Sequence, residues 1–466
     1  MSEKQTAHGT LLSSAPVGRL LLRFAVPSVI SLLVGALYNI IDQIFIGRSV
    51  GPLGNAATNV AFPITTITLS IALLFGIGGA ARFNLCLGTK DSASARRYAA
   101  NSFLGSFCVG VVLMILILLF SQPLVRFLGA TDEIMGYSLT FVRITALGIP
   151  FFMITTSGNH LIRADGSPGY SMLCILSGAV INTILNPILI FKFNMGVTGS
   201  AIATVIGQVI SAILIIFYLT KYKSVSLKPE DFVPRALILR NTISLGAAAC
   251  FNQLALAVVQ IVMNNLLVYY GEASVYGSST ALAVVGVISK INVIFISLVI
   301  GISQGAQPII SYNYGAKNYE RAKKAYLCAL GAATGVAVLA FICFQLFPRQ
   351  ITALFGEGDD LYFQFATEYF RIFLFCTFMN SIQPVTANFF TSIGKATRGI
   401  FISLTRQIIF LLPLIVILPR FLGIDGIMYA GPVADIFSAA AAIIFILYEF
   451  RSHTYWQPAK ESEARC

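Results

Sequence analysis

The sequence has few charged residues and lacks the motifs of soluble enzymes. Asp, Glu, Lys and Arg make up 11% of its 466 residues, whereas soluble domains carry about 25%. No Cys-x-x-Cys pair and no Gly-x-x-x-x-Gly-Lys-Ser/Thr nucleotide-binding motif occurs. No polar stretch is long enough for a soluble domain of about 50 residues. We therefore expect no enzyme, no metal site, no cofactor and no ATPase domain in this sequence.

Long apolar runs dominate instead. The sequence is 57% hydrophobic, and a helix of about 20 mostly apolar residues crosses a bilayer. Twelve runs reach this length, which predicts an all-α integral membrane protein with 12 transmembrane helices. The predicted spans are 19–48, 54–81, 98–120, 136–160, 168–192, 198–220, 237–269, 276–310, 322–347, 361–391, 398–420 and 425–450.

The second half of the sequence repeats the first. Three pairs of motifs recur at an offset of 227 or 228: Gly88–Lys90 with Gly315–Lys317, Gly166 with Gly394, and Gly196 with Gly423. Each half holds six spans, and an even number of spans returns the chain to its starting side, so the repeats must be parallel. We predict a segment 1–18, a six-helix bundle 19–220, a linker 221–236, a second six-helix bundle 237–450 and a tail 451–466.

The net charge of +12 is distributed unevenly between the two sides. If the N-terminus is cytoplasmic, most Lys and Arg residues fall in inside loops, including Arg163, Arg321 and Lys324. This asymmetry is the positive-inside pattern of membrane proteins. It predicts that both termini are cytoplasmic, and it explains the basic charge without nucleic-acid binding.

Asp42 is the clearest candidate for chemistry inside the membrane. It lies in the first span with Tyr38 and Asn39 on the same helix face. A carboxylate in this setting should face an internal cavity, where it could exchange protons or hold Na⁺. Asn182 and Asn186 share one face of the fifth span and lie at the same depth as Asp42. These residues form a candidate cation-coupling site, although the amides could simply lock two helices together.

Other polar residues inside the spans divide into two groups. Arg406 and Asp435 lie at mid-membrane in neighbouring spans and are interpreted as a structural pair. The C-terminal half also carries uncharged amides and a lysine with no obvious acidic partner, which we consider candidates for a substrate cavity. They are Gln260, Asn264, Lys290, Gln304, Gln307, Asn380 and Gln383.

Four segments together resemble the multidrug and toxic compound extrusion (MATE) family, and the last resembles its bacterial drug-pump branch. They are Pro27 with Tyr38-Asn39-x-x-Asp42, Arg163-Ala-x-Gly166, Asn182-x-x-x-Asn186-Pro187, and Gln304-Gly-Ala-Gln307-Pro308 continuing to Gly315-Ala-Lys317. The resemblance covers about residues 19–450.

The resemblance implies a function and a location. Members have two bundles of six helices around an outward V-shaped cleft, and they export organic cations in exchange for H⁺ or Na⁺ by rocker-switch alternating access. Asp42 matches the ion-coupling acid of one subgroup. The expected location is a bacterial inner membrane, and the expected partners are organic cations or drugs and membrane lipids, with the protein acting as a monomer.

One departure and one alternative bear on this interpretation. The subgroup usually has Asp where this sequence has Asn186, so one titratable group is missing, and we favour H⁺ over Na⁺. The alternative function is a flippase for lipids or lipid-linked oligosaccharides, from the same superfamily. Asp42 and the amides argue against the anionic ligand that such a flippase would carry.

Overall fold

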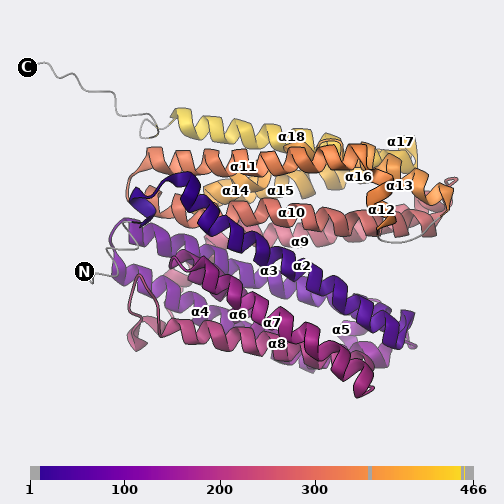
Figure 1. Ribbon diagram of the computed structural model, residues 1–466, viewed down its shortest axis with the longest axis horizontal. Helices are drawn as coiled ribbons and strands as arrows, with labels where there is room; N and C mark the ends of the chain where they lie inside the picture. The colour runs from indigo at the N-terminus through magenta and orange to yellow at the C-terminus, as the bar shows by residue number, and fades with distance from the viewer. Residues whose placement is uncertain (1–10, 355–358, 453–455, 457–466) are drawn as a thin grey trace, which may run out of the picture.

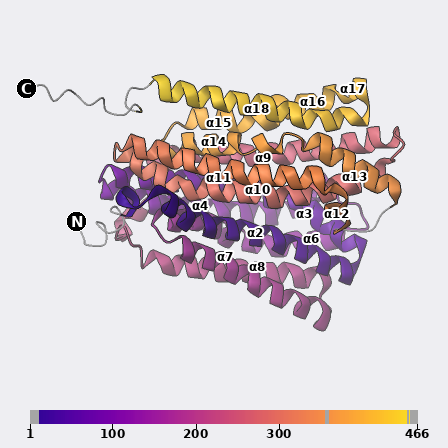
Figure 2. The same cartoon turned by 45° about the horizontal axis from the view of Figure 1, so that its top comes forward.

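The computed structural model describes residues 11–354, 359–452 and Trp456. Most of the predicted segment 1–18 and most of the predicted tail 451–466 lie outside the described residues. The described chain is helical, and its helices run roughly along one long axis (Figure 1). A second view shows the same near-parallel packing of the long helices (Figure 2).

Eleven of the predicted spans are helices long and apolar enough to cross a membrane, among the described residues. Two short helices, α5 (Ser121–Phe127) and α12 (Pro348–Ala353), lie between spans. The spanning helices are α2 (Val17–Val50), α3 (Pro52–Gly88), α4 (Ser92–Leu119), α6 (Met135–Ala164), α7 (Pro168–Pro187) with a π turn (Ile188–Lys192), α8 (Gly196–Leu219), α9 (Ala236–Glu272), α10 (Ser278–Gly315), α11 (Tyr319–Leu346), a composite helix over Ala396–Leu422, and α18 (Ile424–Ser452).

The tenth predicted span is not one helix. Residues 361–391 form α13 (Asp360–Phe373), a 3₁₀ turn (Thr377–Met379) and α14 (Ile382–Ser392), so the expectation of a continuous helix here is wrong. Pro384 lies in the first turn of α14, where its missing N–H needs no intrahelical partner. The two pieces together occupy the place of the remaining span, which keeps six crossing segments in each half.

The composite helix over Ala396–Leu422 is also irregular. It comprises α15 (Ala396–Leu404), a π segment (Thr405–Leu411), α16 (Leu412–Ile417) and α17 (Pro419–Leu422). Pro413 is the second residue of α16 and lies two positions after the end of the π segment. A proline removes one hydrogen bond and crowds the preceding turn, which accounts for the wider turn just before it.

The backbone repeats between the two halves at the predicted offset. Lys90 and Lys317 both adopt the left-handed conformation, with φ of 62° and 60°. The glycine pairs behave in the same way: φ is 80° at Gly166 and 84° at Gly394, and 52° at Gly196 and 60° at Gly423. Matching conformations at matching positions confirm the parallel duplication predicted from the sequence.

The two halves meet closely at the end of the molecule that carries both termini, which we call the closed end. There α2 packs on α10 and α3 packs on α9 (Figure 1). A Cβ added to Gly246 of α9 would overlap the carbonyl oxygen of Leu74 on α3. Gly88, which ends α3, lies against the backbone of α10. Gly315, which ends α10, lies against the backbone of α3. Glycines therefore permit backbone-to-backbone contact between the halves at this end.

The predicted linker 221–236 packs against the N-terminal half. Tyr222 and Val225 are buried in an apolar core with residues of α3, α4, α6, α7 and α8. The buried Asp165, which follows α6, accepts hydrogen bonds from the backbone N–H of Lys223 at 2.7 Å and of Ser224 at 2.8 Å. The Tyr218 hydroxyl donates a third bond to the same carboxylate at 2.8 Å. The linker is thus fixed at its start.

Asp165 provides a pH-dependent prediction. Burial raises the pKa of Asp165 to about 6, against an ordinary value of 3.8, although its hydrogen bonds lower it. Since the folded chain then holds this proton more tightly, stability should fall as pH rises from about 4 to about 6, by on the order of 3 kcal/mol. Asp165→Asn should remove this contribution. Melting temperatures measured in detergent between these pH values would test it, and parallel profiles for the two proteins would contradict it.

Trp456, the only tryptophan in the sequence, packs into the C-terminal half. Trp456 is buried among aromatic rings that include Tyr319 and Phe389, and its Nε1 donates to Glu449 Oε1 at 3.1 Å. The buried Glu449 also accepts from Lys395 Nζ at 2.6 Å and from Arg398. A residue of the predicted polar tail is therefore part of the packed C-terminal half.

Candidate membrane-embedded cation site

The Asp42 carboxylate joins three helices of the N-terminal half. Its Oδ1 accepts hydrogen bonds from Asn186 Nδ2 on α7 and from Ser200 Oγ on α8, the latter at 2.7 Å. Asn186 is fully buried, whereas Asp42 is partly buried. A carboxylate away from water is costly, and hydrogen bonds to the charged form offset about 1.5–3 kcal/mol each. The structure thus brings together the acid and one of the amides predicted to form the site.

A second polar layer lies one helical turn away on α7 and α8. Asn182 Nδ2 donates to Thr204 Oγ1 at 3.1 Å, and Asn182 is buried. Asn182 precedes Asn186 by four residues, and Thr204 follows Ser200 by four, so the two layers are stacked along the same helix pair. Carboxylate, amide and hydroxyl oxygens are the ligands that hard cations prefer. The same carboxylate, amide and hydroxyl groups are also compatible with proton transfer to and from Asp42.

Ser200 and Thr204 were not among the predicted site residues. Their signal in the sequence is weak, because single hydroxyl residues are common in membrane helices and often bond their own backbone. Their spacing of four residues within an apolar helix is the only pattern that marks them. Asn39, in contrast, is exposed and donates to Gly35 O at 2.7 Å on its own helix. Tyr38 lies one turn from Asp42 and is partly buried.

Arg163 occupies an unexpected place. The sequence analysis placed it in an inside loop, but Arg163 is the penultimate residue of α6 and is only 7% exposed. Its Nη1 donates to Ser28 Oγ on α2 at 2.9 Å and to Gln304 Oε1 on α10 at 3.0 Å. Its Nη2 lies 3.0 Å from His160 Nδ1. The expectation of a loop charge is therefore wrong, and Arg163 instead links the two halves near their closed end.

The substrate-cavity candidates fall into two settings. Gln304 bonds Arg163, and Gln307 is buried and donates to Ile77 O on α3 at 3.1 Å, so both make contacts between the halves. Gln383 is also buried and donates to Ile402 O at 2.7 Å, which joins α14 to α15. Asn380 is buried just after the 3₁₀ turn of the broken span.

The remaining three candidates are exposed. Gln260 Nε2 donates to Asn264 Oδ1 at 2.9 Å, one turn along α9, and Lys290 lies on α10. All three lie in the parts of these helices farther from the closed end. Their exposure distinguishes them from Gln307, which is buried, and from Gln304, which is partly buried.

The predicted structural pair is in contact. Arg406 Nε donates to Asp435 Oδ1 at 2.6 Å, and the Asp435 side chain is 1% exposed. Arg406 belongs to the π segment and Asp435 to α18. A buried pair of this kind neutralises two charges that would each be costly inside a membrane. Its contacts are within the C-terminal half, away from Asp42.

A duplicated bundle of membrane-spanning helices with a partly buried carboxylate inside the membrane is typical of secondary transporters. Comparison with known families agrees. The MatE family model matches residues 27–188 and 248–417, which is more than half of the chain and covers both halves. The chain belongs to the MatE family, whose members are transporters and not enzymes.

Two named relatives match this chain over nearly their whole length. The multidrug export protein MepA of Staphylococcus aureus (strain MSSA476) is 26% identical over 439 residues, which cover 93% of this chain and 94% of that protein. MepA of Staphylococcus saprophyticus is 26% identical over 432 residues, with coverage of 91% and 92%.

Two solved structures show the same fold. An outward-facing conformation of a multidrug resistance MATE family transporter superposes with a TM-score of 0.88 at 22% identity, covering 95% of this chain and 98% of that one. A transporter from Pyrococcus furiosus, described as having a binding pocket of reverse polarity that suggests a different function, also gives 0.88 at 22% identity, with coverage of 96% and 99%.

Proposed function

We propose that the chain is a secondary active multidrug exporter that exchanges organic cations or amphiphilic drugs for H⁺ or Na⁺. The observation that carries this proposal is the Asp42 carboxylate, held by Asn186 and Ser200 inside the membrane. A titratable or cation-binding group at this depth couples an ion gradient to transport. The export function of the MepA relatives supports the same conclusion.

Coupling to H⁺ is favoured by the composition of the site. Asn186 is an amide, so Asp42 is the only carboxylate in the set that also contains Asn182, Ser200 and Thr204. A Na⁺ site benefits from additional negative charge and from several converging oxygens. A single carboxylate with two donors is sufficient for one proton, whose binding neutralises the charge that the two donors stabilise.

Alternating access follows from the contact between the halves. The glycines at the end carrying the termini hold α2 on α10 and α3 on α9, which closes that end. With both termini cytoplasmic, as the positive-inside pattern predicts, this arrangement corresponds to an outward-facing state in a bacterial inner membrane. Transport then requires Arg163 to release Gln304 as the halves separate.

Substrate recognition is assigned to the exposed polar groups of the C-terminal half, namely Gln260, Asn264 and Lys290. Neutral amides accept varied ligands because they impose no strict charge requirement. We propose that the protein works as a monomer surrounded by lipid. The alternative, a flippase for lipid-linked oligosaccharides, needs an anion-binding cavity, whereas the N-terminal site has a carboxylate.

The proposal is tested by drug accumulation in cells. Bacteria that lack their own efflux pumps should accumulate less of a fluorescent organic cation when they express this protein, and an uncoupler that collapses the ion gradient should abolish the difference. Equal accumulation with and without the protein, at matched expression in the membrane, would contradict drug export and favour the flippase alternative.

A further inference from the structure

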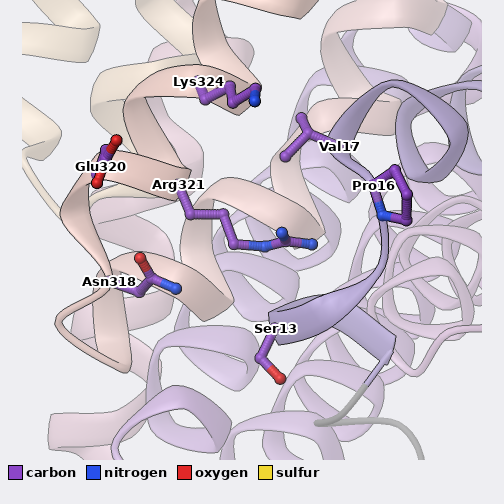
Figure 3. Close-up of a pocket in the computed structure, with 7 residues that line it drawn as sticks. All are labelled: Ser13, Pro16, Val17, Asn318, Glu320, Arg321 and Lys324. Atoms are coloured by element: carbon purple, nitrogen blue, oxygen red, sulfur yellow. The ribbon is translucent and has the colours of Figure 1, made fainter.

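A pocket unconnected with the cation site lies at the end of the molecule that carries both termini. It has a volume of about 300 Å³ and lies between the start of α2 and the first turns of α11 (Figure 3). The residues that line it are Ser13, Pro16, Val17, Asn318, Glu320, Arg321 and Lys324. None of these residues has a role in the proposed transport cycle.

The pocket is positively charged on the side facing α2. Arg321 and Lys324 extend across it towards Pro16 and Val17, whereas the carboxylate of Glu320 points the other way (Figure 3). Among the residues that the structure describes, neither Arg321 nor Lys324 forms a salt bridge. Glu320 also lines the pocket, but neither cation is paired with its carboxylate or with another carboxylate of the described residues.

The Arg321 guanidinium is held in place by the chain before α2. Its Nε donates to Leu12 O at 3.0 Å, and its Nη2 donates to Ala15 O. A guanidinium has five N–H groups, so these two bonds fix its plane and leave donors for a ligand. A fixed guanidinium beside a flexible lysine is suited to phosphate oxygens, which accept bidentate bonds from Arg and a point charge from Lys.

The pocket also lies at the depth of lipid headgroups. Val17 begins the spanning helix α2, and Tyr319 begins the spanning helix α11. Residues at the ends of spanning helices meet the interfacial region of the bilayer, where tyrosine is enriched and lipid phosphates lie. The ligand most available to this pocket is therefore the headgroup of a phospholipid.

The face of α11 below the pocket is open and apolar. Gly331 and Gly335 follow Lys324 by seven and eleven residues, close to two and three helical turns, so the three share one face. A Cβ added to either glycine would meet no atom within 4 Å. Leu327 on the adjacent line is 49% exposed. This strip offers an acyl chain a shallow path that begins directly under the cations.

We propose that the pocket binds the phosphate of an anionic phospholipid, with an acyl chain lying on the Gly331–Gly335 strip. Arg321 and Lys324 recognise the headgroup, and the strip distinguishes a lipid from free phosphate. The site differs from a general basic surface because it combines a fixed guanidinium, a defined volume and an apolar extension along one helix face.

The test is a titration of purified protein in detergent, followed by native mass spectrometry. Phosphatidylglycerol serves as the anionic lipid, phosphatidylcholine as the zwitterionic lipid and glycerol 3-phosphate as the soluble headgroup. Phosphatidylglycerol should bind more tightly than phosphatidylcholine. Lys324→Gln should weaken its binding about fivefold, the effect of about 1 kcal/mol for one lysine near a lipid surface. Glu320→Gln should strengthen it.

Two variants serve as controls. Lys323→Gln removes the same charge from the neighbouring residue, whose Nζ lies over the Phe450 ring at 5.0 Å, and it should leave lipid binding unchanged. Gly331→Leu should fill the strip and weaken both lipids while leaving glycerol 3-phosphate unaffected. Equal losses for Lys323→Gln and Lys324→Gln would overturn the proposal in favour of a general basic surface. Displacement of the lipid by equimolar glycerol 3-phosphate would overturn it in favour of a free-phosphate site.

Discussion

Replacing Asp42 by Asn should reduce gradient-driven efflux to the background of protein-free liposomes while the protein stays folded. The amide oxygen of Asn can still accept the bonds that Asn186 and Ser200 donate to Asp42 Oδ1. It cannot bind and release a proton near neutral pH, and it contributes no negative charge to a cation. The free energy of unfolding should therefore change by no more than about 2 kcal/mol, whereas coupling is lost completely.

The measurement compares efflux of a fluorescent cation from proteoliposomes with melting in detergent. The matched control is Asp132→Asn, the same substitution at an acid whose side chain is 92% exposed and pairs with Arg126 at 3.0 Å. An exposed pair contributes little to stability, so this variant should keep both efflux and melting temperature. Efflux by Asp42→Asn with an unchanged dependence on the gradient would remove Asp42 from the coupling mechanism.

Gly246→Leu should prevent α3 and α9 from packing together at the closed end. A side chain at Gly246 overlaps the backbone of Leu74, and the same helix pair meets at Gly78, where an added Cβ would overlap Thr242 O. Backbone cannot rotate away as a flexible side chain can, so α3 and α9 must separate. Overpacking of this kind costs about 1–3 kcal/mol, and here it falls on one state of the transport cycle.

Spin labels introduced as unnatural amino acids at positions 90 and 317 would report the separation by pulsed electron paramagnetic resonance. Both residues lie in the loops after α3 and α10, and both are exposed. The distance should be longer in Gly246→Leu than in the wild type, and efflux should be lost. Gly286→Leu on α10 is the control, because nothing lies within 4 Å of its added Cβ. An unchanged distance in Gly246→Leu would contradict a rigid glycine contact.

The duplication and the spans were predictable because they depend on local signals. Apolar length predicts a spanning helix, and the glycines that end α3, α6 and their counterparts are conspicuous in the sequence. The left-handed Gly166 and Gly394 show why these glycines recur at one offset. The break before Pro384 was not foreseen, because prolines are common in membrane helices and many of them leave the helix continuous.

The cation site was predicted in part. Asp42 and Asn186 were found because charge and amides are rare at mid-membrane and their depths agreed. Ser200 was not predicted, because a small hydroxyl residue in an apolar helix carries no comparable signal. Arg163 was misplaced because a cation near the end of a span resembles a loop charge. Only tertiary contact with Ser28 and Gln304 reveals its role between the halves.

Efflux from proteoliposomes under imposed gradients tests the proposed function most directly. Wild-type protein is loaded with a fluorescent organic cation and exposed to a pH gradient, a Na⁺ gradient or neither. Efflux driven by the pH gradient, and absent without a gradient, is the result that a proton-coupled exporter built on Asp42 predicts. Efflux that is the same with and without either gradient, or no efflux under any condition, would contradict it.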